Sequence, residues 1–459
     1  MSARLTLATL AFLLLAATGT TLARAGSEAR SADTASRFDA FLRQSARKLD
    51  FNGSVLIAID GRVVLRKGYG QADAADRRRN TPRTRFRISD LTTDFTTVGL
   101  LQLHERGRVR LDRSICAYVP RCPGQWKPLT VRLLLTGPTG LPVVLPRSGS
   151  RSLVAWIDWL KRKPLRFTPG RSGRDRGYAA DLLAAYVLTR VSGLTWIEYL
   201  ERHIFRPLRL TSTGLDRPQA ARATPYVRTR TRRLRPPAAF RRLSVPDVVF
   251  GLMSTVDDMY RFDRALMSGS IVSTALLDEL AATPDVTGHR VWQPTYLHLG
   301  HGPHGTADGW YTAYTRYADE KLLILAFSNL GLSPLSDVVG RLYLIAKGWP
   351  PARVQVDPEL LSRYVGRYTR RDSARRRNVT VVIAPGRNGT LRFGWDLSPR
   401  RLDHARRYAL IPFASDAFYA TGDLYGIAVR FEVGAEPGGD AVHVEFPQGG
   451  RSQRFRRVP

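Results

Sequence analysis

The pattern of hydrophobic and polar residues changes once along this chain, near residue 348. Before that point, apolar residues that recur every three or four positions predict helices, and shorter apolar runs predict strands. After Gly348-Trp349-Pro350-Pro351, which interrupts any regular element, short alternating segments predict strands only. The predicted helices cover residues 37–48, 90–106, 179–192, 195–202 and 334–346. The predicted strands are 311–317 and 322–328 before the change, and 379–383, 391–395, 427–433 and 442–446 after it.

Two local signals in the first part predict a turn and a helix start. Asp60-Gly61 separates two apolar runs, and this dipeptide in such a place predicts a β-hairpin over residues 53–72. Further along, Ser89 and Asp90 precede the helix predicted over 90–106. Ser and Asp are both favourable N-caps, so we expect one of them to cap this helix.

The first 25 residues have the three parts of a secretory signal. Arg4 supplies the positive start, residues 5–17 are mostly apolar, and Ala23-Arg24-Ala25 has the small residues of a cleavage site. The mature chain is therefore expected to begin at Gly26. No later stretch is apolar for long enough to span a bilayer, so we expect an exported protein without a transmembrane segment, either periplasmic or secreted.

The charge of the chain is strongly positive, with 71 Lys and Arg against 39 Asp and Glu and a formal net charge of +32. The arginines are spread along the whole sequence, whereas a nucleic-acid-binding protein usually concentrates them in one patch. We therefore expect a compositional bias and no specific nucleic-acid partner. The alternative is an exposed loop within Arg222 to Arg242 that binds an anionic envelope polymer, with an affinity that falls steeply as salt rises.

The chain has two cysteines, Cys116 and Cys122, which excludes a disulfide-rich scaffold and any zinc module built from several cysteines. They are six residues apart. In an oxidising compartment a local disulfide between them is expected. The alternative is a pair of free, half-buried thiols.

Short phrases in a characteristic order run from about residue 35 to 347. They include Asn52-Gly53-Ser54, Lys67-Gly68-Tyr69-Gly70, Arg85-Phe86-Arg87-Ile88, Thr139-Gly140-Leu141-Pro142, Phe167-Thr168-Pro169-Gly170 and Gly251-Leu252-Met253-Ser254-Thr255. Together they resemble the serine β-lactamase-like superfamily, which contains class C β-lactamases, D-alanyl-D-alanine carboxypeptidases and related esterases. The resemblance implies an α/β (α+β) fold over residues 33–348, in which helices and a helical subdomain flank an antiparallel sheet. It also implies a small β-barrel-like C-terminal domain over 355–459.

The reaction of that superfamily uses Ser-x-x-Lys at a helix start, where the lysine takes the proton of the serine nucleophile. In the register set by Phe95-Thr96, Asp90 occupies the place of the serine and Thr93 that of the lysine. A slip of one residue would offer Ser89, but no lysine occurs from residue 68 to 126. The chain has one Ser-x-x-Lys, at residues 45–48, and it precedes the first predicted strand, so we treat it as a coincidence.

The two other motifs of the superfamily are also altered. Where Tyr-x-Asn is expected, Asp175 stands in the place of the tyrosine and Gly177 in that of the asparagine. Where Lys or His is followed by a small residue and Gly, the chain reads His304-Gly305-Thr306. The backbone amide of Ala307 is then a candidate for an oxyanion hole.

The joint loss of these motifs implies a pseudoenzyme, which would bind a cell-wall peptide or a small ester or amide without acyl-serine catalysis. The alternative is an active serine hydrolase, similar to a β-lactamase, D-alanyl-D-alanine carboxypeptidase or esterase. Its nucleophile would have moved to Ser89 or Asp90, assisted by His304. No cofactor is expected in either case.

Three histidines, His298, His301 and His304, are spaced three residues apart and are weak candidates for a zinc site. On an extended segment this spacing need not bring three side chains together. Hydrogen-bonded histidines along a strand and loop are therefore the favoured interpretation, with no metal.

Overall fold

The computed structural model describes most of the chain after residue 31. The described residues are 32–142, 152–170, 177–216, 221–229, 231, 233–237, 247–282, 297–301, 309–317, 321–331, 333–348, 355–372, 377–386, 390–396, 408–412, 416–420, 428–432, 441–445 and 452–458. The predicted signal, residues 1–25, lies outside them. Among the described helices, none is both long and apolar enough to cross a membrane.

An antiparallel five-stranded sheet in the order β10-β12-β13-β1-β2 forms the centre of the first part. Its strands are β1 (Gly53–Ile59), β2 (Arg62–Tyr69), β10 (Leu297–His301), β12 (Tyr311–Tyr317) and β13 (Leu322–Ser328). The predicted hairpin is present, and Asp60 and Gly61 at its turn have φ values of 50° and 73°. Both residues lie in the left-handed region that a two-residue hairpin turn requires.

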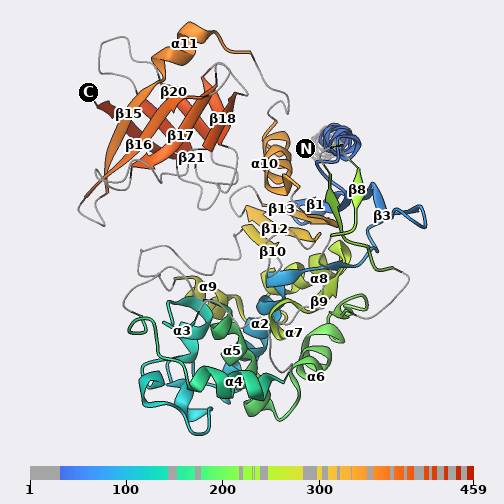
Figure 1. The fold of residues 1–459 in the computed structure, drawn as a ribbon, viewed down its shortest axis with the longest axis vertical. Helices are drawn as coiled ribbons and strands as arrows, with labels where there is room; N and C mark the ends of the chain where they lie inside the picture. Colours follow the sequence, from blue (N-terminus) through green and yellow to red (C-terminus); the bar gives the residue numbers. More distant parts are fainter. Residues whose placement is uncertain are drawn as a thin grey trace, which may run out of the picture.

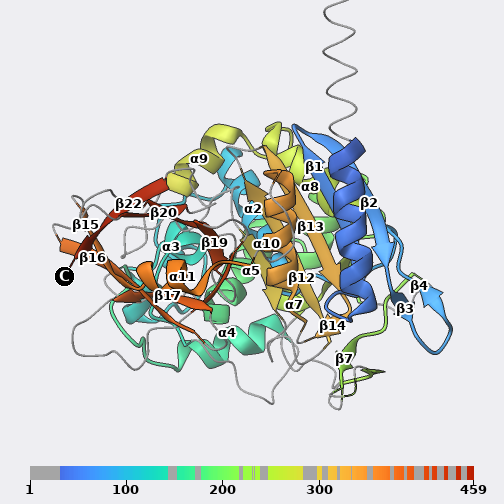
Figure 2. The same ribbon diagram turned by 90° about the horizontal axis from the view of Figure 1, so that it is seen from above.

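Helices cover both faces of this sheet, with α10 above it and α2 and α8 below it in Figure 1. Alternate residues of β1 show the two layers, because Val55 and Ile57 join one core and Leu56 and Ala58 the other. The first core also contains residues of α10 (Leu335–Ala346) and of the helix over 32–47, which lie side by side in Figure 2. A strand buried on both faces favours apolar residues at consecutive positions, which explains the hydrophobic run over residues 55–59 of β1.

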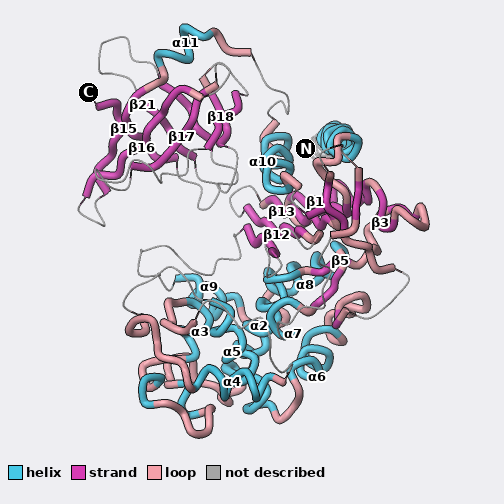
Figure 3. The backbone as a smooth tube through the Cα atoms, in the orientation of Figure 1, coloured by secondary structure: helices cyan, strands magenta, loops and turns pink. Residues whose placement is uncertain are grey.

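The second core joins the sheet to a helical subdomain, which fills the lower part of Figure 3. Its elements are α2 (Thr92–Glu105), α3 (Val131–Thr136), α4 (Leu153–Lys161), α5 (Gly177–Ser192), α6 (Trp196–Leu200), α7 (Asp247–Phe250), α8 (Val256–Met267) and α9 (Thr274–Ala282). Short sheets connect this layer to the central one. They pair β3 (Gln71–Asp73) with β4 (Arg78–Arg79), β5 (Phe86–Arg87) and β6 (Gly214–Leu215) with β9 (Leu252–Ser254), and β14 (Leu330–Gly331) and β8 (Leu234–Arg235) with β7 (Tyr226–Arg228).

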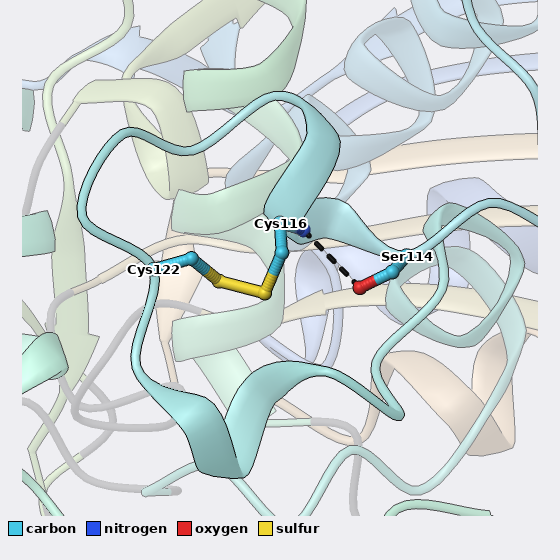
Figure 4. Close-up of a disulfide and its surroundings, with 3 residues drawn as sticks. All are labelled: Ser114, Cys116 and Cys122. Carbon is cyan, nitrogen blue, oxygen red and sulfur yellow. Dashed lines mark hydrogen bonds between the residues drawn. A yellow bond between two sulfur atoms is a disulfide. The ribbon is translucent and has the colours of Figure 1, made fainter.

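Cys116 and Cys122 are joined by a disulfide in this subdomain, with their Cα atoms 5.2 Å apart (Figure 4). Cys116 lies in a 3₁₀ turn, Ile115–Ala117, whose N-cap is Ser114. The Ser114 hydroxyl oxygen accepts a hydrogen bond from the Cys116 amide at 3.3 Å. The expected local disulfide is therefore present in the structure.

The second part of the chain is a closed antiparallel barrel that follows α11 (Pro358–Arg363). Its strands are β15 (Gly366–Asp372), β16 (Arg377–Pro385), β17 (Leu391–Asp396), β18 (Tyr408–Pro412), β19 (Ala417–Ala420), β20 (Ala428–Glu432), β21 (Ala441–Glu445) and β22 (Ser452–Val458). Pairing of β15 with β22 closes the barrel. Aromatic rings fill it, and Tyr364 stacks on Phe431 with ring centroids 4.1 Å apart.

The sequence pattern predicts four of these strands, which the structure contains as β16, β17, β20 and β21. It misses β15, β18, β19 and β22. In β15 and β22, Tyr368 and Phe455 are the buried residues and three of the seven residues in each strand are arginines, so the apolar alternation is weak. Closure of the barrel pairs β15 with β22, and these strands are more than 80 residues apart in sequence. A local sequence pattern carries no information about pairing at that distance.

Candidate functional site

The candidate site is centred on the start of α2, where β5 leads into a 3₁₀ turn, Ser89–Leu91, and then into the helix. The prediction that Ser89 or Asp90 caps the helix is wrong. The cap positions are Ile88 for the turn and Leu91 for α2, and neither makes a side-chain cap hydrogen bond. The reason is that a 3₁₀ turn precedes the helix. Ser89 and Asp90 lie within this turn, so neither residue occupies a cap position.

Ser89 is held in an unusual conformation, with a φ of 49°. Its side chain is fully buried, and its Oγ has no hydrogen-bond partner among the described residues. A nucleophilic serine needs both access to substrate and a base in contact with its hydroxyl. Ser89 has neither within the described part of the chain.

Asp90 and Thr93 are both partly buried and lie one turn apart. The Thr93 hydroxyl donates a hydrogen bond to the backbone carbonyl of Asp90 at 3.0 Å. The two positions that the resemblance assigns to nucleophile and base are therefore adjacent in space, as the motif register requires. They hold a carboxylate and a neutral hydroxyl, and a neutral hydroxyl is no general base near pH 7.

Three other elements adjoin this turn. Strand β10 and helix α7 pack against it, and Ile88 fixes the turn by donating its amide to the Leu252 carbonyl at 3.0 Å. Helix α5 reaches the same region, because Tyr178 in its first turn packs edge-on against Phe250 of α7, with ring centroids 4.7 Å apart. Gly177 begins α5 with a φ of 66°, a conformation that suits glycine.

Several predicted site residues lie outside the described residues. These are Asp175, His304, Gly305, Thr306 and Ala307. His298 and His301 occupy positions of opposite parity in β10, paired with Tyr314 and Tyr311. No group of three metal-ligating residues occurs in the part of the chain that the structure describes.

A buried ion pair that sequence reasoning missed lies between α8 and β12. Asp263 is fully buried and accepts hydrogen bonds from the Tyr314 hydroxyl at 2.8 Å and the Arg316 Nε at 2.9 Å. A second Arg316 nitrogen donates to the other oxygen of Asp263. Burial, together with Asp263, raises the pKa of Tyr314 well above its usual range. The signal for this pair was a charged residue, Arg316, inside an otherwise buried strand.

The predicted Arg-rich loop is partly structured. Tyr226–Arg228 and Leu234–Arg235 form β7 and β8, while residues 230, 232 and 238–242 lie outside the described set. Arg222 pairs with Asp216 and Arg228 with Asp50. The expectation of an exposed loop is thus wrong for Tyr226–Arg228, where Tyr226 is buried and Arg228 pairs with the distant Asp50, whereas Arg235 in β8 is exposed. Binding of an anionic polymer to this segment stays a prediction.

Comparison with known proteins defines the family. The beta-lactamase family model matches residues 38–348, which is more than half of the chain. The chain belongs to the beta-lactamase family. The predicted resemblance and fold class are therefore confirmed.

Relatives within and around this family cover different shares of the chain. The putative penicillin-binding protein PbpX of Bacillus subtilis is 24% identical over 292 residues, which is 62% of this chain and 72% of PbpX. Protein flp of Staphylococcus aureus is 26% identical over 192 residues, 40% of this chain but only 38% of flp. The octameric penicillin-binding protein homologue from Pyrococcus abyssi superposes with a TM-score of 0.58 at 18% identity, covering 92% of this chain and 99% of that one.

Proposed function

We propose that this protein is an exported member of the beta-lactamase family that binds a ligand at the start of α2 without forming an acyl-enzyme. The observation that carries the proposal is the pair Asp90 and Thr93, to which the motif register of the resemblance assigns the places of nucleophile and base. Export rests on the predicted signal over residues 1–25.

The chemistry of that pair argues against acyl transfer. An acyl-enzyme needs a nucleophile whose proton is removed by a base in contact with it. A carboxylate is a poor nucleophile toward amides, and the Thr93 hydroxyl already donates to the Asp90 carbonyl. An ionised carboxylate only accepts hydrogen bonds, so Asp90 favours a ligand with N–H or ammonium donors. A cell-wall peptide or a small amide or ester with an amino group meets this requirement.

A second candidate function is hydrolysis by a relocated nucleophile at Ser89. It is favoured by the φ of 49° at Ser89, since strained backbone clusters at functional sites. Against it stand the full burial of the Ser89 side chain and the absence of a hydrogen-bond partner for Oγ within the described residues. Substrate could reach this hydroxyl only if the turn opened.

Mass spectrometry of the intact mature protein distinguishes the two functions. The protein is incubated separately with a penicillin and with a fluorophosphonate, beside an active member of the family. We expect no adduct on the natural protein. A stoichiometric adduct would overturn the proposal, and peptide mapping would name the nucleophile; loss of that adduct in Ser89→Ala would establish the second candidate.

A matched variant tests whether the reactive pair alone restores labelling while the two other altered motifs stay as they are. The double substitution Asp90→Ser and Thr93→Lys restores serine and lysine three residues apart on one helix face. We expect fluorophosphonate to label this variant at residue 90 while the natural protein stays unlabelled. A circular dichroism melt of both proteins controls for folding.

A further inference from the structure

The C-terminal barrel consists of eight strands, β15 to β22, which pair antiparallel around a closed ring. A barrel of eight strands is just wide enough for side chains to fill it, or to hold one small ligand. Tyr368 of β15 is 1% exposed and belongs to the barrel core. Alternate residues of a strand face the same side, so Arg370 also faces inward. A charged side chain on this apolar inner face requires an explanation.

The two ends of the barrel differ in their packing. Helix α11 lies over one end, above the strands in Figure 1 and within their outline in Figure 2. The rings of Tyr364, Phe418 and Phe431 are packed there, and the centroids of Phe418 and Phe431 are 5.5 Å apart. Toward the opposite end, β16 and β20 contribute the smaller Val379 and Val429 to the barrel core. Aromatic rings therefore close the α11 end, whereas aliphatic side chains line this part of the opposite end.

The cross-strand neighbours of Arg370 are apolar. In the register of β15 with β16, Arg370 is paired with Val379. On its other side, the guanidinium carbon of Arg370 lies 5.6 Å from the centroid of the Phe455 ring. Phe455 is fully buried, so this contact places the guanidinium on the inner side of the barrel. The ring attracts the positive charge, but it does not accept the in-plane N–H bonds that a carboxylate would accept.

A second arginine on the inner side of the barrel shows what Arg370 lacks. Arg457 of β22 donates to the carbonyls of Arg363 and Val365, at 3.2 and 2.7 Å, and so holds the end of α11. The Nε of Arg370 is buried and has no hydrogen-bond partner within the described residues. An unsatisfied buried donor on a charged group is costly, and a bound acceptor would explain it. We propose that the barrel end at Arg370 binds a small monocarboxylate with an apolar body.

The chemistry of the barrel end suits this ligand. The planar fork of a guanidinium matches the two oxygens of a carboxylate, and one negative charge balances one arginine. The valines and Phe455 would contact the apolar body, and a mostly apolar lining with a single placed polar group is typical of small-molecule sites. Arg370 and Val379 are both partly exposed, so the ligand enters at this end. The inference goes beyond the function proposed at α2, because the carboxylate of Asp90 would repel such a ligand.

Isothermal titration calorimetry of the full mature chain tests the site with two carboxylates, decanoate and naphthoate. We expect saturable binding of one molecule per chain for at least one of them, and the preferred probe tells a flexible chain from a planar ring. Decanol, which has the same chain length without the charge, should bind about 10-fold more weakly than decanoate or less tightly still, since it lacks the charged acceptor. The absence of saturable binding for both carboxylates, or equal affinities for decanoate and decanol, would overturn the proposal.

Three variants locate the binding at this end of the barrel. Arg370→Gln should weaken the carboxylate affinity about 10-fold or more, because it removes the charged donor, and an unchanged affinity would contradict the site. Arg371→Gln is the matched control: the next residue of β15 faces outward and is exposed, so its loss should leave the affinity unchanged. Circular dichroism melts control for folding. If Arg370→Gln fails to fold, Val379→Trp decides, because it fills the same end and keeps the arginine; carboxylate binding that persists in Val379→Trp would overturn the proposal.

Discussion

The Thr93 hydroxyl lies 3.0 Å from the carbonyl oxygen of Asp90 and donates a hydrogen bond to it. A lysine at position 93 would bring an amine to the same turn of the helix, where it could take a proton from residue 90. Thr93 instead donates its hydroxyl to the backbone carbonyl of Asp90, which stabilises the turn before the helix. The helix can therefore begin here without a serine and a lysine.

Replacing Ser89 by glycine should stabilise the protein by about 1 kcal/mol. Glycine adopts a φ of 49° without steric cost, and the substitution removes a buried hydroxyl that has no partner in the described residues. The greater freedom of glycine in the unfolded chain offsets part of the gain. Urea unfolding measures the difference. Ser89→Ala is the control. It should increase the free energy of unfolding by less, because alanine at the same φ keeps the backbone strain. A glycine variant less stable than the natural protein would contradict strain at residue 89.

Loss of the buried partner of Arg316 should be strongly destabilising. Asp263→Ala leaves a guanidinium that is 11% exposed without its carboxylate, and breaking such a pair costs about 3–5 kcal/mol. Chemical unfolding of the variant gives this value. Asp257→Ala is the matched control, because its partner Arg66 is 46% exposed and such pairs contribute about 1 kcal/mol or less. Equal losses in the two variants would argue against the special role of burial.

Asp39, in the helix over residues 32–47, should make the free energy of unfolding decrease as the pH becomes acidic. Asp39 accepts hydrogen bonds from Arg43, Lys67 and Tyr69, and the bond from Arg43 is the largest cause that holds the pKa of Asp39 well below its usual value. A lowered folded-state pKa contributes stability above the unfolded pKa of about 4, and this contribution is lost as pH falls below it.

Asp39→Asn tests this dependence. At neutral pH the variant should be less stable than the natural protein by about 1 kcal/mol, since Arg43 and Lys67 are largely exposed. The two unfolding free energies should approach each other as the pH is lowered from about 5 toward 2. A difference that stays constant over this range would show that charge on Asp39 is not the cause.

The Cys116–Cys122 disulfide should contribute about 2 kcal/mol, because it closes a short loop and so restricts the unfolded chain only modestly. The double variant Cys116→Ser and Cys122→Ser should melt at a lower temperature than the oxidised protein. Reduction of the natural protein should lower its melting temperature by a similar amount. No change on reduction would mean that the thiols are free in solution.

The sequence alone determined those helices, strands and turns whose pattern lies within a few neighbouring residues. The Asp60-Gly61 turn, the apolar runs of β12 and β13 and the helical spacing of α5 and α10 are of this kind, and each appears where its pattern predicted. The order of short phrases also identified the family and set the register that places Asp90 and Thr93 one turn apart. Backbone propensity and side-chain periodicity are local properties, so they can be read without a structure.

Only the tertiary structure decided how distant polar residues are paired. Arg87 and Asp216 are 129 residues apart in sequence, and nothing near either one indicates the other. The same holds for Asp263 with Arg316, for the closure of the barrel by β15 and β22, and for the positive φ of Ser89. In a chain with so many arginines, each carboxylate has many candidate partners. The selection is made by the packing of strands and helices that brings particular charges within hydrogen-bonding distance in a buried place.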